Sequence, residues 1–252
     1  MELTDFKDYY KHLNTNQLYL PEEIRYTHFR FFCPRPVKIP KILKTKRDVK
    51  KILEAYSPMH AFYIPSYFLQ PNEVGERGND EACFLSSIEL VLDIDRKDED
   101  KTWEENLNDA KIDTSRLINS IQDLYELSPK LIVYSGCKGF HIHYDIKNLI
   151  PPDSFWLKFD RREDSSIQLK KKMVREIVAR TGIRLDEPAT WNTRGLMRIP
   201  GTIHGGTGAL VEVIKRSQIR NYHPKIIVNV SQYVRKHGDA KELEKMVLGG
   251  LL

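Results

Sequence analysis

Cysteine is scarce in this sequence: Cys33, Cys83 and Cys137 are the only three among 252 residues, and they lie far apart. The lack of a Cys-x-x-Cys pair argues against a disulfide framework and against a zinc knuckle, and it fits a reducing cytoplasm. No window approaches about 18 consecutive apolar residues, and the first residues show no signal-peptide pattern. We therefore expect neither membrane insertion nor secretion.

Internal repeats, low-complexity tracts and convincing linkers are also lacking, whereas 40% of the residues are hydrophobic, enough to bury a core. One α+β domain over residues 1–252 is the simplest account. The net charge is only +5, but basic residues cluster in segments 38–51 and 170–175. Such clusters suit a polyanion, although each is equally well explained as the solvated face of a surface helix.

Apolar periodicity and turn residues predict a set of helices and strands. We expect helices at residues 4–13 (capped by Thr4), between Thr45 and Pro58, at 113–128, at 165–181 and at 239–249. We expect strands at residues 61–68, 88–95, 131–134, 140–145, 196–199 and 209–214. Residues 71–80 are predicted to form a loop, and the highly charged segment 96–111 is predicted to be exposed.

The most informative segment is the strand at residues 88–95, which ends in an Asp-x-Asp pair. Side chains alternate along a strand, so Asp93 and Asp95 project from one face while Leu92 and Ile94 enter the core from the other. Two adjacent anions repel unless a cation lies between them. A pair of divalent metal ions there could hold a nucleotide triphosphate, although strand ends also carry simple solvated acids.

A second segment joins the strands at 131–134 and 140–145 through the turn Ser-Gly-Cys-Lys-Gly. The turn offers backbone N–H groups, the Ser135 hydroxyl and the Lys138 ammonium, which are groups that bind phosphate oxygens. His141 and His143 follow on one face of the second strand. A hairpin with two surface histidines is the plainer interpretation, and a zinc site lacks a third ligand nearby in the sequence.

A third segment contains Asp186 and then two arginines, Arg194 and Arg198, with His204 beside a glycine-rich turn. An acid followed by these cations suits a third metal ligand and a set of triphosphate contacts. Generic surface loops also contain such residues.

Taken together and in this order, the three segments resemble the three motifs of the archaeo-eukaryotic primase superfamily, and specifically of the catalytic small subunit of archaeal and eukaryotic DNA primase. Residues 91–95 are similar to its first metal motif. The turn that ends at His141 matches its Ser-Gly-x-Arg-Gly-x-His motif, and Asp186 with residues 196–208 resembles the third. Residues 9–10, 20–21 and 57–63 match more weakly. The resemblance implies a primase catalytic core with a mixed or antiparallel, RRM-like sheet, flanking helices and an N-terminal αβ unit.

The resemblance also implies roles for individual residues. Asp93, Asp95 and Asp186 would bind two Mg²⁺ or Mn²⁺ ions. The phosphates of the incoming nucleotide would be held by a larger set, namely Ser135, Gly136, Lys138, Gly139, His141, Arg198 and His204. The reaction is in-line nucleotidyl transfer, which makes or extends primers on a single-stranded DNA template from NTPs or dNTPs. A primase large subunit, or another replication or repair protein, is the expected partner, in the cytoplasm of an archaeal cell or in an archaeal mobile element.

Two features depart from the family pattern. Lys138 stands where the family usually has Arg, which replaces a bidentate clamp by a point charge. The 42 residues between His143 and Asp186 contain no cysteine, so we expect no zinc site and a minimal catalytic core.

Three alternatives stay open. One is a repair or mobile-element polymerase of the same superfamily that needs an existing primer. The others are a non-catalytic nucleic-acid-binding subunit that has kept the fold and an unrelated metal-dependent phosphohydrolase. All three acids are present, and the turn at residues 135–139 suits a triphosphate better than an attacking water, so we favour the polymerase.

Overall fold

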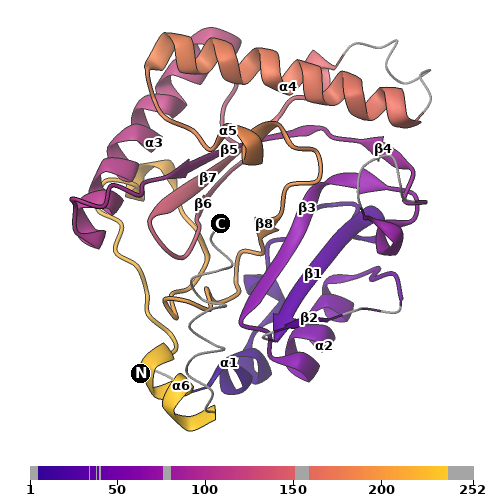
Figure 1. Cartoon of the computed structure of the whole chain (residues 1–252), viewed down its shortest axis with the longest axis vertical. Helices are drawn as coiled ribbons and strands as arrows, with labels where there is room; N and C mark the ends of the chain where they lie inside the picture. Colours follow the sequence, from indigo (N-terminus) through magenta and orange to yellow (C-terminus); the bar gives the residue numbers. More distant parts are fainter. Residues whose placement is uncertain are drawn as a thin grey trace.

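The computed structural model describes residues 5–33, 35–37, 39, 41–75, 81–150 and 159–237. Helices and strands alternate irregularly along the chain, as in an α+β protein (Figure 1). The helices are α1 (Phe6–His12), α2 (Lys46–Tyr56), α3 (Trp103–Tyr125), α4 (Phe159–Thr181), α5 (Glu187–Trp191) and α6 (Val230–His237). The strands are β1 (Thr27–Cys33), β2 (Arg35–Val37), β3 (His60–Phe68), β4 (Phe84–Ser86), β5 (Glu89–Asp95), β6 (Leu131–Tyr134), β7 (Gly139–Asp145), β8 (Met197–Arg198) and β9 (Glu212–Val213).

The strands form two sheets, and all the pairs between these strands are antiparallel. One sheet has the order β2-β1-β3-β4, with the short strand β8 also paired to β3. The other has the order β5-β7-β6-β9. The late strand β8 thus joins the N-terminal sheet, and it lies between the two sheets in Figure 1. The α+β class with antiparallel sheets and flanking helices is confirmed.

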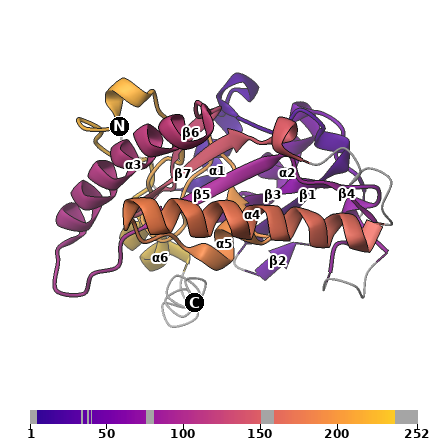
Figure 2. The same cartoon turned by 90° about the horizontal axis from the view of Figure 1, so that it is seen from above.

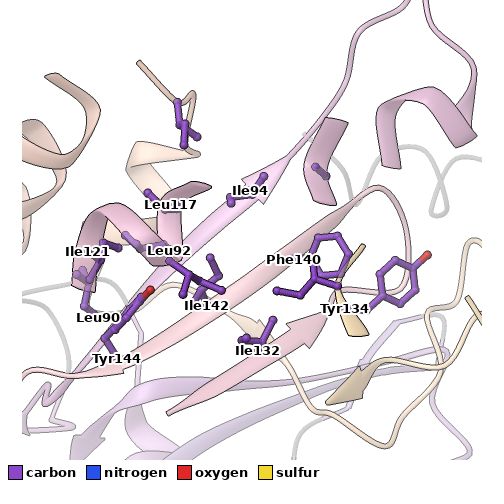
Figure 3. Close-up of a cluster of buried hydrophobic side chains, with 14 of the residues drawn as sticks. Leu90, Leu92, Ile94, Leu117, Ile121, Ile132, Tyr134, Phe140, Ile142 and Tyr144 are labelled. Carbon is purple, nitrogen blue, oxygen red and sulfur yellow. The ribbon is translucent and has the colours of Figure 1, made fainter. Parts of the chain in front are cut away.

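The second sheet buries one face against α3 and α4. Alternation along β5 sends Leu90, Leu92 and Ile94 into this core, where their exposure is 0%. Residues from β6, β7 and α3 complete the cluster in Figure 3, among them Ile132, Tyr134, Phe140, Ile142, Tyr144, Leu117 and Ile121. The opposite face of the sheet, which carries the acids of β5, is therefore turned away from α3 and towards the N-terminal half.

The N-terminal sheet packs on α1 and α2 through a second core. Phe31 of β1 and Tyr63 of β3 share this core with Val49 and Leu53 of α2, and Val91 of β5 belongs to it as well. Because Val91 lies on the acid-bearing face of β5, this core joins the two sheets. Figure 2 shows α4 running along both of them.

Helix starts follow the local capping chemistry. Thr45 and Asp48 form a capping box that begins α2, as predicted. Asp5 caps α1 with its side chain, while Thr4 lies outside the described residues. The helix predicted at 239–249 also lies outside them, and α4 begins earlier than expected, at Phe159.

The prediction that residues 96–111 are exposed holds for residues 97–102 and is wrong for the part of the segment that belongs to α3. Thr102 and Glu105 form a capping box, so α3 begins at Trp103 instead of near residue 113. Its first turns bury Asn106, Leu107, Ala110 and Lys111. The many charges of this segment masked the Thr-x-x-Glu start and the apolar spacing behind it. Strands β1, β2 and β4 and helices α5 and α6 were not predicted.

The core on α3 can be tested with one substitution made at two positions. Ile118 is fully buried and Ile112 is 56% exposed on the same helix. We expect Ile118→Ala to lower the free energy of unfolding by roughly 2–4 kcal/mol, because it removes buried methylenes and leaves a cavity. Ile112→Ala should change it by less than about 0.5 kcal/mol. Urea unfolding followed by circular dichroism measures both, and equal losses would contradict this placement of α3.

Candidate active site

Two predicted acids lie opposite the predicted nucleotide motif on neighbouring strands. In the β5–β7 pair, Asp93 is opposite His141 and Asp95 is opposite Gly139. A Cβ at Gly139 would lie 2.1 Å from the Ile94 carbonyl oxygen, so only glycine permits this close approach of the strands. The first two motifs are thus brought together by strand register.

Asp186 reaches the same place from the loop after α4. Its backbone N–H donates to the Asp93 carbonyl oxygen over 3.0 Å. Its side chain caps α5 by accepting from the Ala189 N–H at 3.0 Å. Thr190 of α5 strengthens the junction, since its hydroxyl donates to the Asp186 carbonyl and accepts, at 3.4 Å, from the Asp93 N–H.

The three acids act on one another electrostatically. Burial, and then the charges of Asp95 and Asp186, raise the pKa of Asp93 to about 7, although Lys97 and Arg198 act in the opposite direction. Lys97 pairs with Asp95 at 3.1 Å. Within the described ranges, no three His, Cys, Asp or Glu side chains are grouped closely enough to hold a metal ion. The donor chemistry nevertheless fits a hard divalent cation, because clustered carboxylates repel until a cation neutralises them.

The turn at residues 135–139 packs against the turn at residues 204–208. Gly136 has a φ of +96°, and a Cβ there would lie 2.5 Å from the His204 Cβ. The Thr207 hydroxyl donates to the Gly136 carbonyl oxygen at 2.5 Å, which ties the two turns together. The Ser135 hydroxyl bonds the Gly139 carbonyl within its own turn. Lys138 is half-buried beside Cys137.

His141 lies buried between these turns and the acids. Its Nε2 is 3.6 Å from an Asp93 oxygen, and its Nδ1 has no hydrogen-bond partner in the described part of the chain. Burial, with the nearby His143 and Arg198, lowers the pKa of His141 to about 3, so the imidazole is neutral. A buried ring nitrogen without a hydrogen-bond partner lowers the stability of the fold unless a bound ligand supplies the hydrogen bond.

Arg198 faces the acids from β8 in the other sheet. Its guanidinium lies 4.8 Å from the centre of the Phe62 ring, and no described carboxylate forms an ion pair with it. Burial lowers the pKa of Arg198 to about 10, which leaves it charged at neutral pH. His204 is buried, and its Nδ1 accepts from the backbone N–H groups of Gly206 and Thr207. A partly buried cation without a carboxylate partner suits an anionic ligand.

The structure thus brings residues of all three motifs to one place, with Asp186 joined through its backbone rather than in a ready ligand cluster. Arg194 is not among them, because it forms an ion pair with Glu163 of α4. Two residues at this place were missed by the sequence analysis: Thr190, described above, and His60, whose Nδ1 is 2.9 Å from Arg198. His60 lies in the weakly matching segment 57–63, which was the available signal. Conversely, Lys170 of the basic segment 170–175 is 1% exposed and donates to Ser87, so it cannot contact nucleic acid from the surface.

Comparisons with known proteins agree with this geometry, although no protein-family model matches the chain. A DNA primase small subunit PriS from Pyrobaculum islandicum is 26% identical, with 74% of this chain and 70% of the relative covered. The PriS of Thermoplasma volcanium is 21% identical, with 72% and 68% covered. Among solved structures, the polymerase domain of Mycobacterium tuberculosis ligase D in complex with DNA aligns with a TM-score of 0.53 and 12% identity. That alignment covers 96% of this chain and 91% of the other.

The fold is therefore that of a primase-like polymerase domain. The archaeal relatives confirm the resemblance to the archaeo-eukaryotic primase superfamily that the motifs indicated. The chain is a homologue of proteins named DNA primase small subunit. Among the described residues, no helix is long and apolar enough to cross a membrane.

The raised pKa of Asp93 predicts a dependence of stability on pH. The folded-state pKa of about 7 lies above that of an unfolded chain, so folded protein binds the proton more tightly and loses stability as pH rises from about 4 to 7. In metal-free buffer at pH 8, Asp93→Asn should be more stable than the wild type by roughly 2–4 kcal/mol. The difference should vanish near pH 4. Urea unfolding at both pH values measures it, and an unchanged difference would show that Asp93 is not protonated in this range.

Divalent ions should restore the stability that the wild type loses at pH 8 through the ionised Asp93. Mn²⁺ or Mg²⁺ that binds the folded acids raises the melting temperature at pH 8 by mass action, whereas Asp93→Asn should respond weakly. Asp123→Asn, which removes an exposed carboxylate of α3, is the control and should respond like the wild type. An equal response of all three proteins would place metal binding elsewhere.

Proposed function

We propose that the chain is a template-directed nucleotidyltransferase of the primase small-subunit type, which makes or extends primers on single-stranded DNA from NTPs or dNTPs. One observation carries the proposal: the acids of β5, the turn before β7 and the cation of β8 meet at one place although they lie far apart in the sequence. The acids on one side could hold metal ions, and the cations on the other side could contact phosphates. This arrangement suits a nucleotide triphosphate.

The acids and the cations would have different tasks. Asp93, Asp95 and Asp186 would hold two Mg²⁺ or Mn²⁺ ions, which supply a lowered pKa for the attacking 3′-hydroxyl and charge neutralisation for the triphosphate. The phosphates would contact the chain through Ser135, Gly136, Lys138, Gly139, His141, Arg198 and His204.

Within the group of phosphate-binding residues, the chemistry of Arg198 and His141 matches the proposed task. Arg198 brings positive charge that no described carboxylate neutralises. His141 brings a ring nitrogen that is neutral and free to donate or accept a hydrogen bond. Such preorganised groups act on developing charge without reorganising during the reaction.

Template binding is assigned to the basic segment 38–51 at the surface. Lys41, Lys44, Arg47 and Lys51 are exposed there, while Lys38 lies outside the described residues. Contacts of this kind release counterions, so template affinity should fall steeply with salt. The proposed partner is a primase large subunit or another replication or repair protein, and the proposed location is the cytoplasm. We also propose one catalytic domain over residues 1–252, which the core shared by both sheets supports.

Nucleotide incorporation tests the proposal. The purified chain is incubated with single-stranded template, Mn²⁺ or Mg²⁺ and labelled NTPs or dNTPs, with and without an annealed primer. Asp93→Ala and Asp95→Ala should each lower incorporation by at least about a thousandfold, since each removes a metal ligand, while the circular dichroism spectrum is unchanged. Asp123→Asn should incorporate nucleotides at the wild-type rate.

The outcome separates the alternatives. Products formed without a primer identify a self-sufficient primase, and extension of a primer alone identifies a repair-type or partner-dependent polymerase. Incorporation that survives in the aspartate variants would refute the roles given to those residues. A complete lack of incorporation, together with template binding, would favour a non-catalytic subunit.

Lys138 offers a graded test of the turn at residues 135–139. Lysine contacts a phosphate as a point charge, whereas arginine can donate two parallel hydrogen bonds. We expect Lys138→Met to raise the KM for the nucleotide about tenfold and Lys138→Arg to lower it or leave it unchanged. Steady-state kinetics on a primed template measures both, and a KM unaffected by Lys138→Met would remove this residue from the site.

A further inference from the structure

A histidine outside the three motifs contacts the guanidinium of the proposed nucleotide site. His60 is the first residue of β3, and in the β3–β8 pair Phe62 lies opposite Arg198. Side chains two residues apart on a strand share a face, so His60 and Phe62 both lie beside Arg198. The His60 and Phe62 rings stack with centroids 6.0 Å apart.

His60 and Phe62 contact Arg198 in different ways. The Nη1 atom of Arg198 lies 2.9 Å from Nδ1 of His60, while the guanidinium lies over the Phe62 ring. Guanidinium has only donors, so the histidine nitrogen must accept. Burial, and then the charge of Arg198, lower the pKa of His60 to about 3, which keeps the ring neutral and able to accept.

The position of the His60 ring is itself fixed by the turn at residues 204–208. A Cβ at Gly205 would lie 2.8 Å from Nε2 of His60, so the turn leaves room for the ring only because residue 205 is glycine. The His204 ring crosses that of His60 nearly perpendicularly, with centroids 5.6 Å apart. His60 is therefore packed between the arginine and the turn that carries His204.

A carboxylate at position 60 would also accept a hydrogen bond from Arg198. It would, however, neutralise the positive charge of the guanidinium, which is the charge that attracts a phosphate. A neutral acceptor orients the guanidinium and leaves its charge, and its other donors, for the ligand.

We propose that His60 is a positioning residue of the nucleotide site: it accepts a hydrogen bond from Arg198 and fixes the guanidinium for contact with the triphosphate. This inference rests on the function proposed above, because it concerns the same site. It adds a residue from the N-terminal sheet to a site otherwise built from the three motifs.

Two substitutions at His60 separate orientation from packing. In His60→Leu the acceptor is lost, and in His60→Asn the side-chain amide oxygen can replace Nδ1. We expect His60→Leu to raise the KM for the nucleotide about tenfold with a change in kcat of less than about threefold, as expected for a lost hydrogen bond to a charged group that contributes to binding. His60→Asn should stay within about threefold of the wild-type KM. His223→Leu, at an exposed histidine, is the control and should behave like the wild type.

A binding measurement without turnover makes the result independent of activity. The dissociation constant of a fluorescent ATP analogue in the presence of Mn²⁺ should rise about tenfold in His60→Leu and not in His60→Asn. In an Arg198→Ala background, His60→Leu should add no further loss, because the effect acts through the arginine.

The possible results distinguish this inference from the proposed function. If the wild-type protein binds the analogue but incorporates no nucleotides, the proposed function is refuted. The dissociation constants of the His60 variants then decide whether His60 positions Arg198. Unchanged KM and binding in His60→Leu would overturn the inference alone. Equal losses in His60→Leu and His60→Asn, with lowered melting temperatures, would also overturn it, since they indicate a packing role. Wild-type protein that neither binds nor incorporates nucleotides would overturn both.

Discussion

Repulsion among carboxylates at the end of β5 is the constraint on which the rest of this site depends. Burial, together with the charges of Asp95 and Asp186, raises the pKa of Asp93 far above the ordinary value for an aspartate. Such a cluster is unfavourable for folding and persists only where the surrounding structure holds it in place. The register of β5 against β7, and the bonds from Asp186 and Thr190 to the Asp93 backbone, provide that support. The cluster thus lowers the stability of the fold at the place where we propose that a cation binds.

The fold keeps a second charge, that of Arg198, on the opposite side of the same site. Arg198 belongs to the N-terminal sheet through β8, whereas the acids belong to the β5 sheet, so the separation of cation and acids depends on how the sheets pack. Val91 fixes that packing from the acid-bearing face of β5. Glu89, on the same face, is buried between Lys130 and His143 and lies near Tyr63 and Tyr67 of β3. The bonds to Lys130 and His143 keep this buried carboxylate satisfied within the β5 sheet, where it faces β3.

The sequence predicts those parts of the site that strand periodicity determines. Alternation places Asp93 and Asp95 on one face of β5, and the glycine turn before β7 follows from its composition, so both motifs could be located from the residues alone. Periodicity within one strand does not predict which residues of other strands it contacts. It therefore could not show that Arg198 lies beside His60. It also failed at residues 96–111, where charge hid a capping box, and at Lys170, whose burial depends on tertiary contacts with Ser87.

Neutral histidines explain how cations and anions coexist in so small a space. His141 and His204 are buried and His60 is partly buried, and each has a pKa lowered by burial, with Arg198 contributing in every case. A charged imidazole at any of these positions would compete with Arg198 for the proposed phosphate, or pair with Asp93 in place of the proposed metal ion. Held neutral, the three rings supply directed hydrogen bonds and leave the charge balance to one arginine, the surrounding lysines and the three acids. The low pKa values therefore follow from the same burial that assembles the site, and they keep these three rings neutral across the physiological pH range.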